Sequence, residues 1–296
     1  MLVLAFLRQE SRHPNAILPP ALFRNRTFVY GCLIVLCMGA GLFGAVQFLP
    51  TFLQAALGSS ATASGLISTP QAVGLLVSSI LGGQVVARTG RFKCMVVLGA
   101  LLTVISAFLL TRLDAGTVPW HISVSMVISG LGGGMIGPLM SVVIQNSVSH
   151  EFIGVATSSR QFFMQISQVV GVAAFGVIST TSYTNTFTDE TARVREAIPA
   201  VTYEQFQDPT LALDPLRYAA VRSTVLALPD GRGEAVLAEA LEAQKDAVTV
   251  AIRRLFWASL GIGVVMVFLA LTIREVPIRS TFRPSEDEAI SGLAGG

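Results

Sequence analysis

Charged residues are scarce in this 296-residue chain, and their scarcity excludes an ordinary soluble domain. Asp, Glu, Lys and Arg together make up 13% of the sequence, against about 25% in an average soluble domain. The net charge of +2 gives no hint of a nucleic-acid partner. Hydrophobic residues make up 52% of the chain, and its mean hydropathy is +0.66. The composition therefore predicts a polytopic membrane protein.

Cysteine and histidine are also rare, which leaves little material for a metal site or a reactive centre. The three cysteines are an odd number, and Cys32 and Cys37 point to different faces of a helix, so neither a disulfide nor a metal pair is indicated. His13, His121 and His150 are scattered over connectors. The hydrophobic spans hold no Asp or Glu in their interiors, and no hydrolase motif appears. We expect no enzyme activity, no metal and no cofactor.

Six hydrophobic runs are each long enough to cross a bilayer, whose core of about 30 Å needs about 20 apolar residues in a helix. The predicted spans are 27–48, 61–86, 94–111, 121–145, 153–180 and 255–273. We interpret residues 1–26 as the end of a preceding helix and a cytoplasmic linker. The other predicted units are the transmembrane helices within 27–181 and 251–275, an external loop over 182–250, and a disordered cytoplasmic tail over 276–296.

Basic residues in the short connectors predict the orientation of the chain, because Lys and Arg favour the cytoplasmic side. One side carries Arg8, Arg12, Arg24, Arg26, Arg88, Arg91, Lys93, Arg274, Arg279 and Arg283. The short connectors on the other side carry Arg112 alone. Both termini are therefore expected in the cytoplasm and the 182–250 loop outside the cell. The membrane is expected to be the plasma membrane.

Four of the six spans carry polar side chains at depths where an unpartnered polar group costs free energy. In the fifth span, Gln161, Gln165 and Gln168 fall on one narrow stripe at 100° per residue. The same reasoning makes substrate-cavity candidates of Phe43, Gln47, Gln54, Gln71 and Ser141. Cavity lining and hydrogen bonding between helices both remain open for the glutamines. The third and sixth spans have few polar groups and are expected to face lipid.

Small residues form a second stripe, at Gly130, Gly134 and Gly137 of the fourth span. Glycines spaced by four residues in an apolar helix more often permit close helix packing than bind a ligand. The sequence does not favour a phosphate-binding loop here, because no strand precedes these glycines and no Lys-Ser/Thr pair follows them. We assign the three glycines to helix packing.

Several motifs resemble the second half of a major facilitator superfamily exporter, and more narrowly the fourteen-helix drug:proton antiporter branch. They are Pro20–Phe28 (PALFRNRTF), Phe48–Gln54 (FLPTFLQ) and Gly58–Gly65 (GSSATASG). The connector Gly83–Lys93 (GQVVARTGRFK) is similar to the family's cytoplasmic gating loop, with Gly83, Arg88, Gly90 and Arg91 at its key positions. The resemblance implies that the six spans form one half of a major facilitator fold, with the first, second, fourth and fifth around the central cavity.

The chain departs from the family pattern at two places. Ala87 stands where the family signature has Asp, which implies a weaker gate. In the fifth span the family favours an Arg where this chain has Met164, and Arg160, one turn earlier, could supply a displaced positive charge.

The resemblance implies a C-terminal half of an exporter that uses the proton gradient to move hydrophobic or amphipathic compounds of the multidrug type. Its expected partners are the small hydrophobic substrate, membrane lipid, and the N-terminal half or a second copy of the chain. Residues that bind the transported proton are expected mostly in the missing half. Two alternatives stay open. The chain could be a truncated remnant that does not transport, or a membrane sensor or scaffold that uses its external loop.

Overall fold

The computed structural model describes residues 20–114, 116–208, 210–211, 214–228, 232–273 and 275. Those residues contain helices and connectors but no strand. Six helical segments are long and apolar enough to cross a membrane: Arg26–Ala55, Ala61–Thr89, Lys93–Leu110, Pro119–Asn146, His150–Glu190 and Gly233–Thr272. The prediction of an all-α protein with six membrane helices is confirmed. The predicted helix end before residue 20 and the predicted tail from 276 lie outside the described residues.

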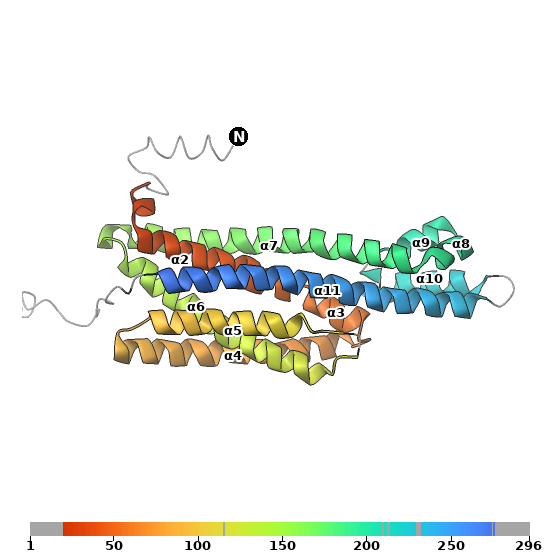
Figure 1. Cartoon of the computed structure of the whole chain (residues 1–296), viewed down its shortest axis with the longest axis horizontal. Helices are drawn as coiled ribbons and strands as arrows, with labels where there is room; N and C mark the ends of the chain where they lie inside the picture. The colour runs from red at the N-terminus through yellow and green to blue at the C-terminus, as the bar shows by residue number, and fades with distance from the viewer. Residues whose placement is uncertain are drawn as a thin grey trace, which may run out of the picture.

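The spans run roughly parallel and antiparallel along one long axis (Figure 1). They are formed by α2 (Arg26–Cys37) with η2 (Met38–Gly44) and α3 (Leu49–Ala55), then α4 (Ala61–Thr89), α5 (Lys93–Leu110), α6 (Pro119–Asn146), α7 (Ile153–Glu190) and α11 (Gly233–Thr272). A short helix, η1 (Pro20–Arg24), precedes α2, and another, η3 (His150–Phe152), precedes α7. Both η1 and the last turn of α11 lie at the left-hand end in Figure 1.

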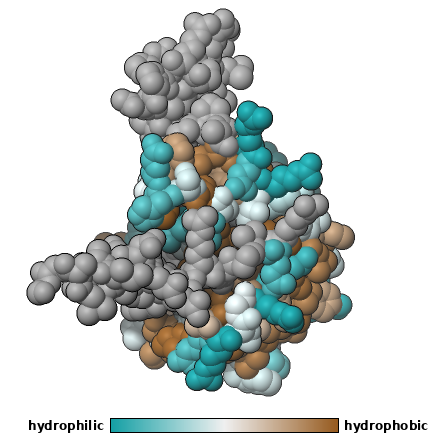
Figure 2. Space-filling view, turned by 90° about the vertical axis from the view of Figure 1, so that its left-hand side faces the viewer, coloured by the Kyte–Doolittle hydropathy of each residue, from teal (hydrophilic) through white to brown (hydrophobic). Residues whose placement is uncertain are grey.

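Basic side chains gather at that left-hand end, which we call the basic end. It holds Arg24 at the end of η1 and Arg26 at the start of α2. It also holds Arg88 near the end of α4, Arg91 in the α4–α5 connector and Lys93 at the start of α5. Figure 2 looks onto this end and shows hydrophilic side chains there, with hydrophobic ones along the flanks behind them. The bundle thus has a polar, basic end and apolar sides, as a membrane-spanning bundle requires.

Close helix packing places α6 inside the bundle. The backbone of α4 approaches α6 at Gly74, where an added Cβ would lie 2.7 Å from the carbonyl oxygen of Val127. On another side of α6, Ser106 of α5 donates a hydrogen bond of 2.8 Å to the carbonyl oxygen of Ser125. The most apolar stretch of α6 is 56% buried, whereas those of the α4 and η3–α7 segments are each only 17% buried. These two helices therefore present the most unpartnered surface.

The first span is not one regular α-helix. Between α2 and α3 the chain forms the π-helix η2, and it turns at Gln47 and Phe48 before α3 begins. Glycines at 39, 41 and 44 of η2 admit neighbours closely, since an added Cβ at Gly41 would lie 2.9 Å from Cγ2 of Ile262. Wide turns of this kind inside helices often mark functional positions.

The segment 182–250, predicted as an external loop, consists largely of helix among its described residues. The helix α7 continues to Glu190 and α11 begins at Gly233, while α8 (Ala192–Ala197), α9 (Ala200–Phe206) and α10 (Pro215–Leu226) lie between them. We call the described residues from Tyr183 to Ile252 the helical cap. It projects beyond the other spans at the end opposite the basic end (Figure 1).

The helical pattern in the cap escaped the prediction because it is amphipathic rather than uniformly apolar. In the first half of α11, the buried residues Leu237, Ala240, Gln244 and Ala247 recur at helical spacing, while exposed charges occupy the other faces. A search for membrane spans by hydropathy passes over such a helix. At 40 residues, α11 is about 60 Å long, twice the bilayer core.

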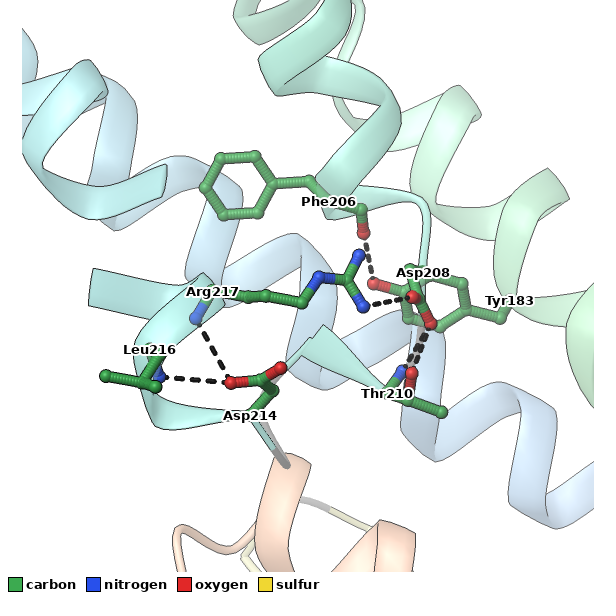
Figure 3. Close-up of polar contacts among 7 residues, drawn as sticks. All are labelled: Tyr183, Phe206, Asp208, Thr210, Asp214, Leu216 and Arg217. Atoms are coloured by element: carbon green, nitrogen blue, oxygen red, sulfur yellow. Dashed lines mark hydrogen bonds and ion pairs between the residues drawn. The ribbon is translucent and has the colours of Figure 1, made fainter. Parts of the chain in front are cut away.

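Polar contacts hold the cap together (Figure 3). The hydroxyl of Tyr183 donates to the carbonyl oxygen of Phe206 over 2.6 Å. Arg217 and Asp208 form an ion pair of 3.1 Å, and the Thr210 hydroxyl donates to the same carboxylate. The carboxylate of Asp214 caps α10 by accepting from the backbone N–H groups of residues 216 and 217. The cap is thus an ordered unit built on α7 and α11.

Candidate transport surface

The glutamine stripe of α7 lies on the exposed side of the helix. Gln161 and Gln165 are exposed and Gln168 is half-buried, whereas the packed side carries Ser167 and Gly171. Among the described residues, none of the three glutamines hydrogen-bonds to another helix. Gln161 accepts only from its neighbour Arg160, over 3.2 Å. The adjoining apolar residues of α7, at 162, 166 and 169, are exposed as well. The amides therefore share one open surface with hydrophobic side chains.

Gln71 behaves differently, because its amide joins two helices. Its Nε2 donates to the hydroxyl of Ser129 on α6 over 3.3 Å, in a part-buried setting. Ser141 is half-buried, and its hydroxyl donates to the carbonyl oxygen of Gly137 one turn earlier. Gln71 therefore fits the interpretation of a hydrogen bond between helices. The glutamines of α7 make no such bond among the described residues and have exposed or half-buried side chains.

Three candidates lie along the irregular first span. Phe43 is half-buried in η2, Gln47 is exposed in the turn after it, and Gln54 is half-buried in α3. No hydrogen bond among the described residues brings these side chains together with the glutamines of α7. The structure therefore places them as separate polar points along the bundle.

The glycines predicted to pack do so unequally. A Cβ at Gly130 would collide with the carbonyl oxygen of Gln71, and one at Gly134 would collide with the Ser78 hydroxyl and the Leu75 carbonyl. At Gly137 the nearest atom, the methyl group of Met38, would be at an ordinary contact distance of 3.7 Å. Close approach therefore depends on Gly130 and Gly134 and far less on Gly137.

The connector expected to act as a gating loop lies at the basic end with Gly83, Arg88, Gly90 and Arg91 all exposed. Gly90 ends α4 in the left-handed conformation, with φ of 68°, and its N–H donates to the carbonyl oxygen of Val86 over 2.8 Å. Only glycine adopts this conformation without strain. The loop glycine therefore has a clear local role in terminating the helix.

Arg160 is half-buried near the basic end of α7. Its Nε is buried and has no hydrogen-bond partner among the described residues, while its guanidinium Nη2 donates to Oε1 of Gln161. A cation at this depth is costly unless paired or solvated. The described membrane segments offer it no ion pair.

Two contacts at helix ends were not anticipated from the sequence. The Asn25 side chain caps α2 by accepting from Thr27 N–H over 3.0 Å, and its amide donates to the carbonyl oxygen of Ser147 after α6. An Asn immediately before an apolar run is a helix-start signal, so the capping of α2 by Asn25 could have been predicted. The link to residue 147 depends on tertiary structure.

Comparisons with known proteins agree with this architecture. The model of the Major Facilitator Superfamily matches residues 2–172. The multidrug transporter protein MdtP of Bacillus subtilis (strain 168) is 37% identical over 198 residues, which cover 67% of this chain and 36% of that protein. The tetracycline resistance determinant of Streptomyces rimosus is 30% identical over 210 residues, 70% of this chain and 58% of that protein.

A third relative extends the likeness to the cap. The MFS-type transporter Rv1877 of Mycobacterium tuberculosis (strain ATCC 25618 / H37Rv) is 30% identical over 286 residues, 95% of this chain. An alignment of that extent has to include the cap. The chain spans little more than a third of this relative and of the Bacillus transporter, at 37% and 36% of their lengths. The family match covers more than half of the 296 residues, so the chain belongs to the major facilitator superfamily.

Proposed function

We propose that this chain is the C-terminal half of a fourteen-helix exporter that moves hydrophobic or amphipathic compounds out of the cell in exchange for protons. The observation that carries the proposal is the exposed surface of α7, where Gln161 and Gln165 lie beside Phe162 and Ile166. Amides left in hydrocarbon without a partner are costly. A water-filled cavity in the assembled transporter would solvate them and offer apolar walls to a drug-like substrate.

The named functions of two relatives support this substrate class. One is named a multidrug transporter and another a tetracycline resistance determinant. The chain matches little more than a third of the first, which fits one wall of a cavity between two halves. The six stretches predicted from the sequence to lie in the membrane, the last of which is 255–273, contain no Asp or Glu, so we assign proton binding to the other half. No cofactor enters this mechanism beyond the proton gradient.

We place the protein in the plasma membrane with the basic end and both termini in the cytoplasm. The cluster of Lys and Arg at one end supports that orientation. The helical cap then lies outside the cell. In this proposal Arg88, Gly90 and Arg91 form the cytoplasmic gating loop, and Arg160 supplies a positive charge toward the other half.

The test compares two glutamines whose surroundings differ. In the transporter assembled with its upstream helices, Gln165→Leu should change dye efflux and drug resistance at an unchanged protein level. Gln71→Leu is the matched structural variant, because it removes the hydrogen bond to Ser129 and should reduce the amount of folded protein. Wild-type efflux in the Gln165→Leu transporter, or a fall in its abundance that matches the fall in resistance, would contradict cavity lining.

A further inference from the structure

An outward groove lies between the ends of α4 and α5 that are distant from the basic end, with α6 as its floor. α4 contacts α6 where Gly74 meets Val127, and α5 contacts it where Ser106 meets Ser125. Between those two lines of contact, residues 124, 127 and 131 of α6 fall within about 60° of one another at 100° per residue. They form an apolar strip that α4 and α5 flank.

Two cavities lie along this strip. A cavity of about 380 Å³ is lined by Val127 and Leu131 of α6 with Leu66, Val73 and Val77 of α4. These three α4 side chains are all exposed, Leu66 by 68%. One turn nearer the start of α6, a second cavity of about 560 Å³ is lined by residue 124 and by the α5–α6 connector. Residues 124 and 127 are one turn apart on this strip, and each lines one of the two cavities. We call the cavity of 380 Å³ the trough and the cavity of 560 Å³ the mouth.

Charged and amphipathic groups line the mouth but not the trough. The Arg112 guanidinium carbon lies 5.1 Å from the centroid of the Phe108 ring, and the rings of Trp120 and His121 are 3.9 Å apart between centroids. Arg112 has no ion pair among the described residues. Trp at such a position is typical of the membrane–water boundary. The mouth therefore lies where headgroups lie.

Asp114 adds a negative charge to the same mouth. Its Oδ1 accepts from the Gly116 N–H and the Thr117 hydroxyl, each over 2.9 Å. Oδ2 accepts no hydrogen bond from the described residues. The mouth therefore offers a guanidinium and an imidazole as donors to a phosphate, and a carboxylate oxygen as an acceptor for an ammonium group.

From these features we infer that the groove binds one zwitterionic phospholipid of the leaflet opposite the basic end. Its phosphate lies at Arg112 and His121, its ammonium at Asp114, and an acyl chain along Val127 and Leu131. The dimensions agree, because the eleven helical steps from Trp120 to Leu131 rise about 16 Å, half of the bilayer core of about 30 Å. A helix of another protein fits less well, since it would bury the charges of the mouth.

The groove faces away from the glutamines. On α6, Gly133 contacts Leu42 of the first span and lies on the other side of the helix from residue 124. The first span in turn packs against α7, which carries the three glutamines, as at Gly39 against Ser167. The inference therefore goes beyond drug export and does not depend on it. A lipid bound here would fix α4 and α5 relative to α6 at the end where they separate.

Native mass spectrometry of the purified, delipidated chain tests the inference with three probes. They are dioleoyl phosphatidylethanolamine, dioleoylglycerol without a phosphate, and the water-soluble glycerophosphoethanolamine without acyl chains. We expect the phospholipid to bind at least about tenfold more tightly than either, since hydrogen bonds to charged groups contribute about that factor. Equal binding of the soluble headgroup would overturn the inference in favour of a free-phosphate site.

Variants separate a built site from the general lipid shell. Arg112→Ala should abolish the preference for phospholipid over dioleoylglycerol, and Arg112→Lys should retain most of it. Val73→Trp, or Leu66→Trp if the first fails to fold, should weaken the binding of both the phospholipid and dioleoylglycerol, because the indole would fill the trough. The matched control is Arg254→Ala, because Arg254 is an exposed arginine beside Trp257 on α11. It lies at the same end of the bundle as Arg112, since its neighbour Arg253 donates to the carbonyl oxygen of Thr111. Equal losses in Arg112→Ala and Arg254→Ala would mean a general lipid shell and would overturn the inference.

Discussion

At Gly134 the backbones of α4 and α6 approach so closely that one added methyl group would meet the Leu75 carbonyl and the Ser78 hydroxyl. The Leu75 carbonyl belongs to the backbone of α4, so it cannot move away without shifting that helix. We expect Gly134→Ala to destabilise the bundle by about 1–3 kcal/mol, the usual cost of overpacking, measured as a lower thermal unfolding midpoint in detergent. Gly261→Ala is the control, because nothing lies within 4 Å of a Cβ there. Equal midpoints for the two variants would refute the packing role.

Two glutamines show why the sequence alone does not predict the role of a polar side chain. The residue types of Gln71 and Gln165 are the same, and both lie on polar stripes in apolar helices, yet one bonds to Ser129 and the other is exposed. The neighbour that a side chain meets depends on how its helix is rotated about its own axis within the bundle. The spacing of polar residues along one helix does not specify that rotation. The glycine stripe was more informative because only small residues permit close backbones.

At the scale of elements, hydropathy and span length were enough to predict six helices and where most of them begin. Predicted span 94–111 and α5, Lys93–Leu110, differ by one residue at each end. The cap was missed because its helices bury one face on each other rather than in lipid. The π-helix η2 was not predicted, because the apolar run at 38–44 does not distinguish an α-helix from a π-helix. In the structure its glycines pack closely on α7 and α11, as at Gly39 against Ser167.

The cap should respond to acid through Asp208. Burial alone would raise the pKa of this carboxyl group, but hydrogen bonds from Thr210 and the adjacent Arg217 guanidinium hold it below its ordinary value. A lowered pKa means that the ionised group stabilises the fold above pH about 3.9, the ordinary aspartate value. That contribution is lost as the pH falls through the lowered pKa.

We therefore expect amide hydrogen exchange in α9 and α10 to accelerate, beyond its intrinsic pH dependence, as the pH is lowered below about 4. Asp208→Ala should accelerate exchange at neutral pH and remove that additional acid response. Glu204→Ala, an exposed change on α9, should alter neither. An unchanged acid response in Asp208→Ala would assign it to other groups.

The whole molecule has one basic end and one capped end, and this asymmetry yields a test of orientation. In a Cys94→Ser background, which removes the exposed native cysteine, Leu216→Cys in the cap should react with an impermeant maleimide in intact cells. Leu216 is 84% exposed, so access does not limit the reaction. Thr89→Cys, exposed at the basic end, should react only after permeabilisation. Labelling of Thr89→Cys in intact cells would reverse the proposed topology.

A half-transporter should not export on its own. The least buried helices of the bundle, α4 and α7, leave much of their surface without a protein partner, and on α7 that surface includes the amides of Gln161 and Gln165. Each amide left in hydrocarbon costs on the order of 1 kcal/mol or more, so this surface favours association with the proposed other half or with a second copy of the chain.

The measurement is dye efflux from cells that lack their major exporters, with this chain alone and with the upstream helices supplied as a separate polypeptide. We expect no proton-dependent efflux from the chain alone and restored efflux from the pair, because alternating access needs two halves that move around a site between them. Collapse of the proton gradient should abolish the restored efflux. Efflux by the chain alone, in a form shown to be monomeric by crosslinking, would contradict the half-transporter proposal, since a single wall of helices cannot enclose a substrate from both sides.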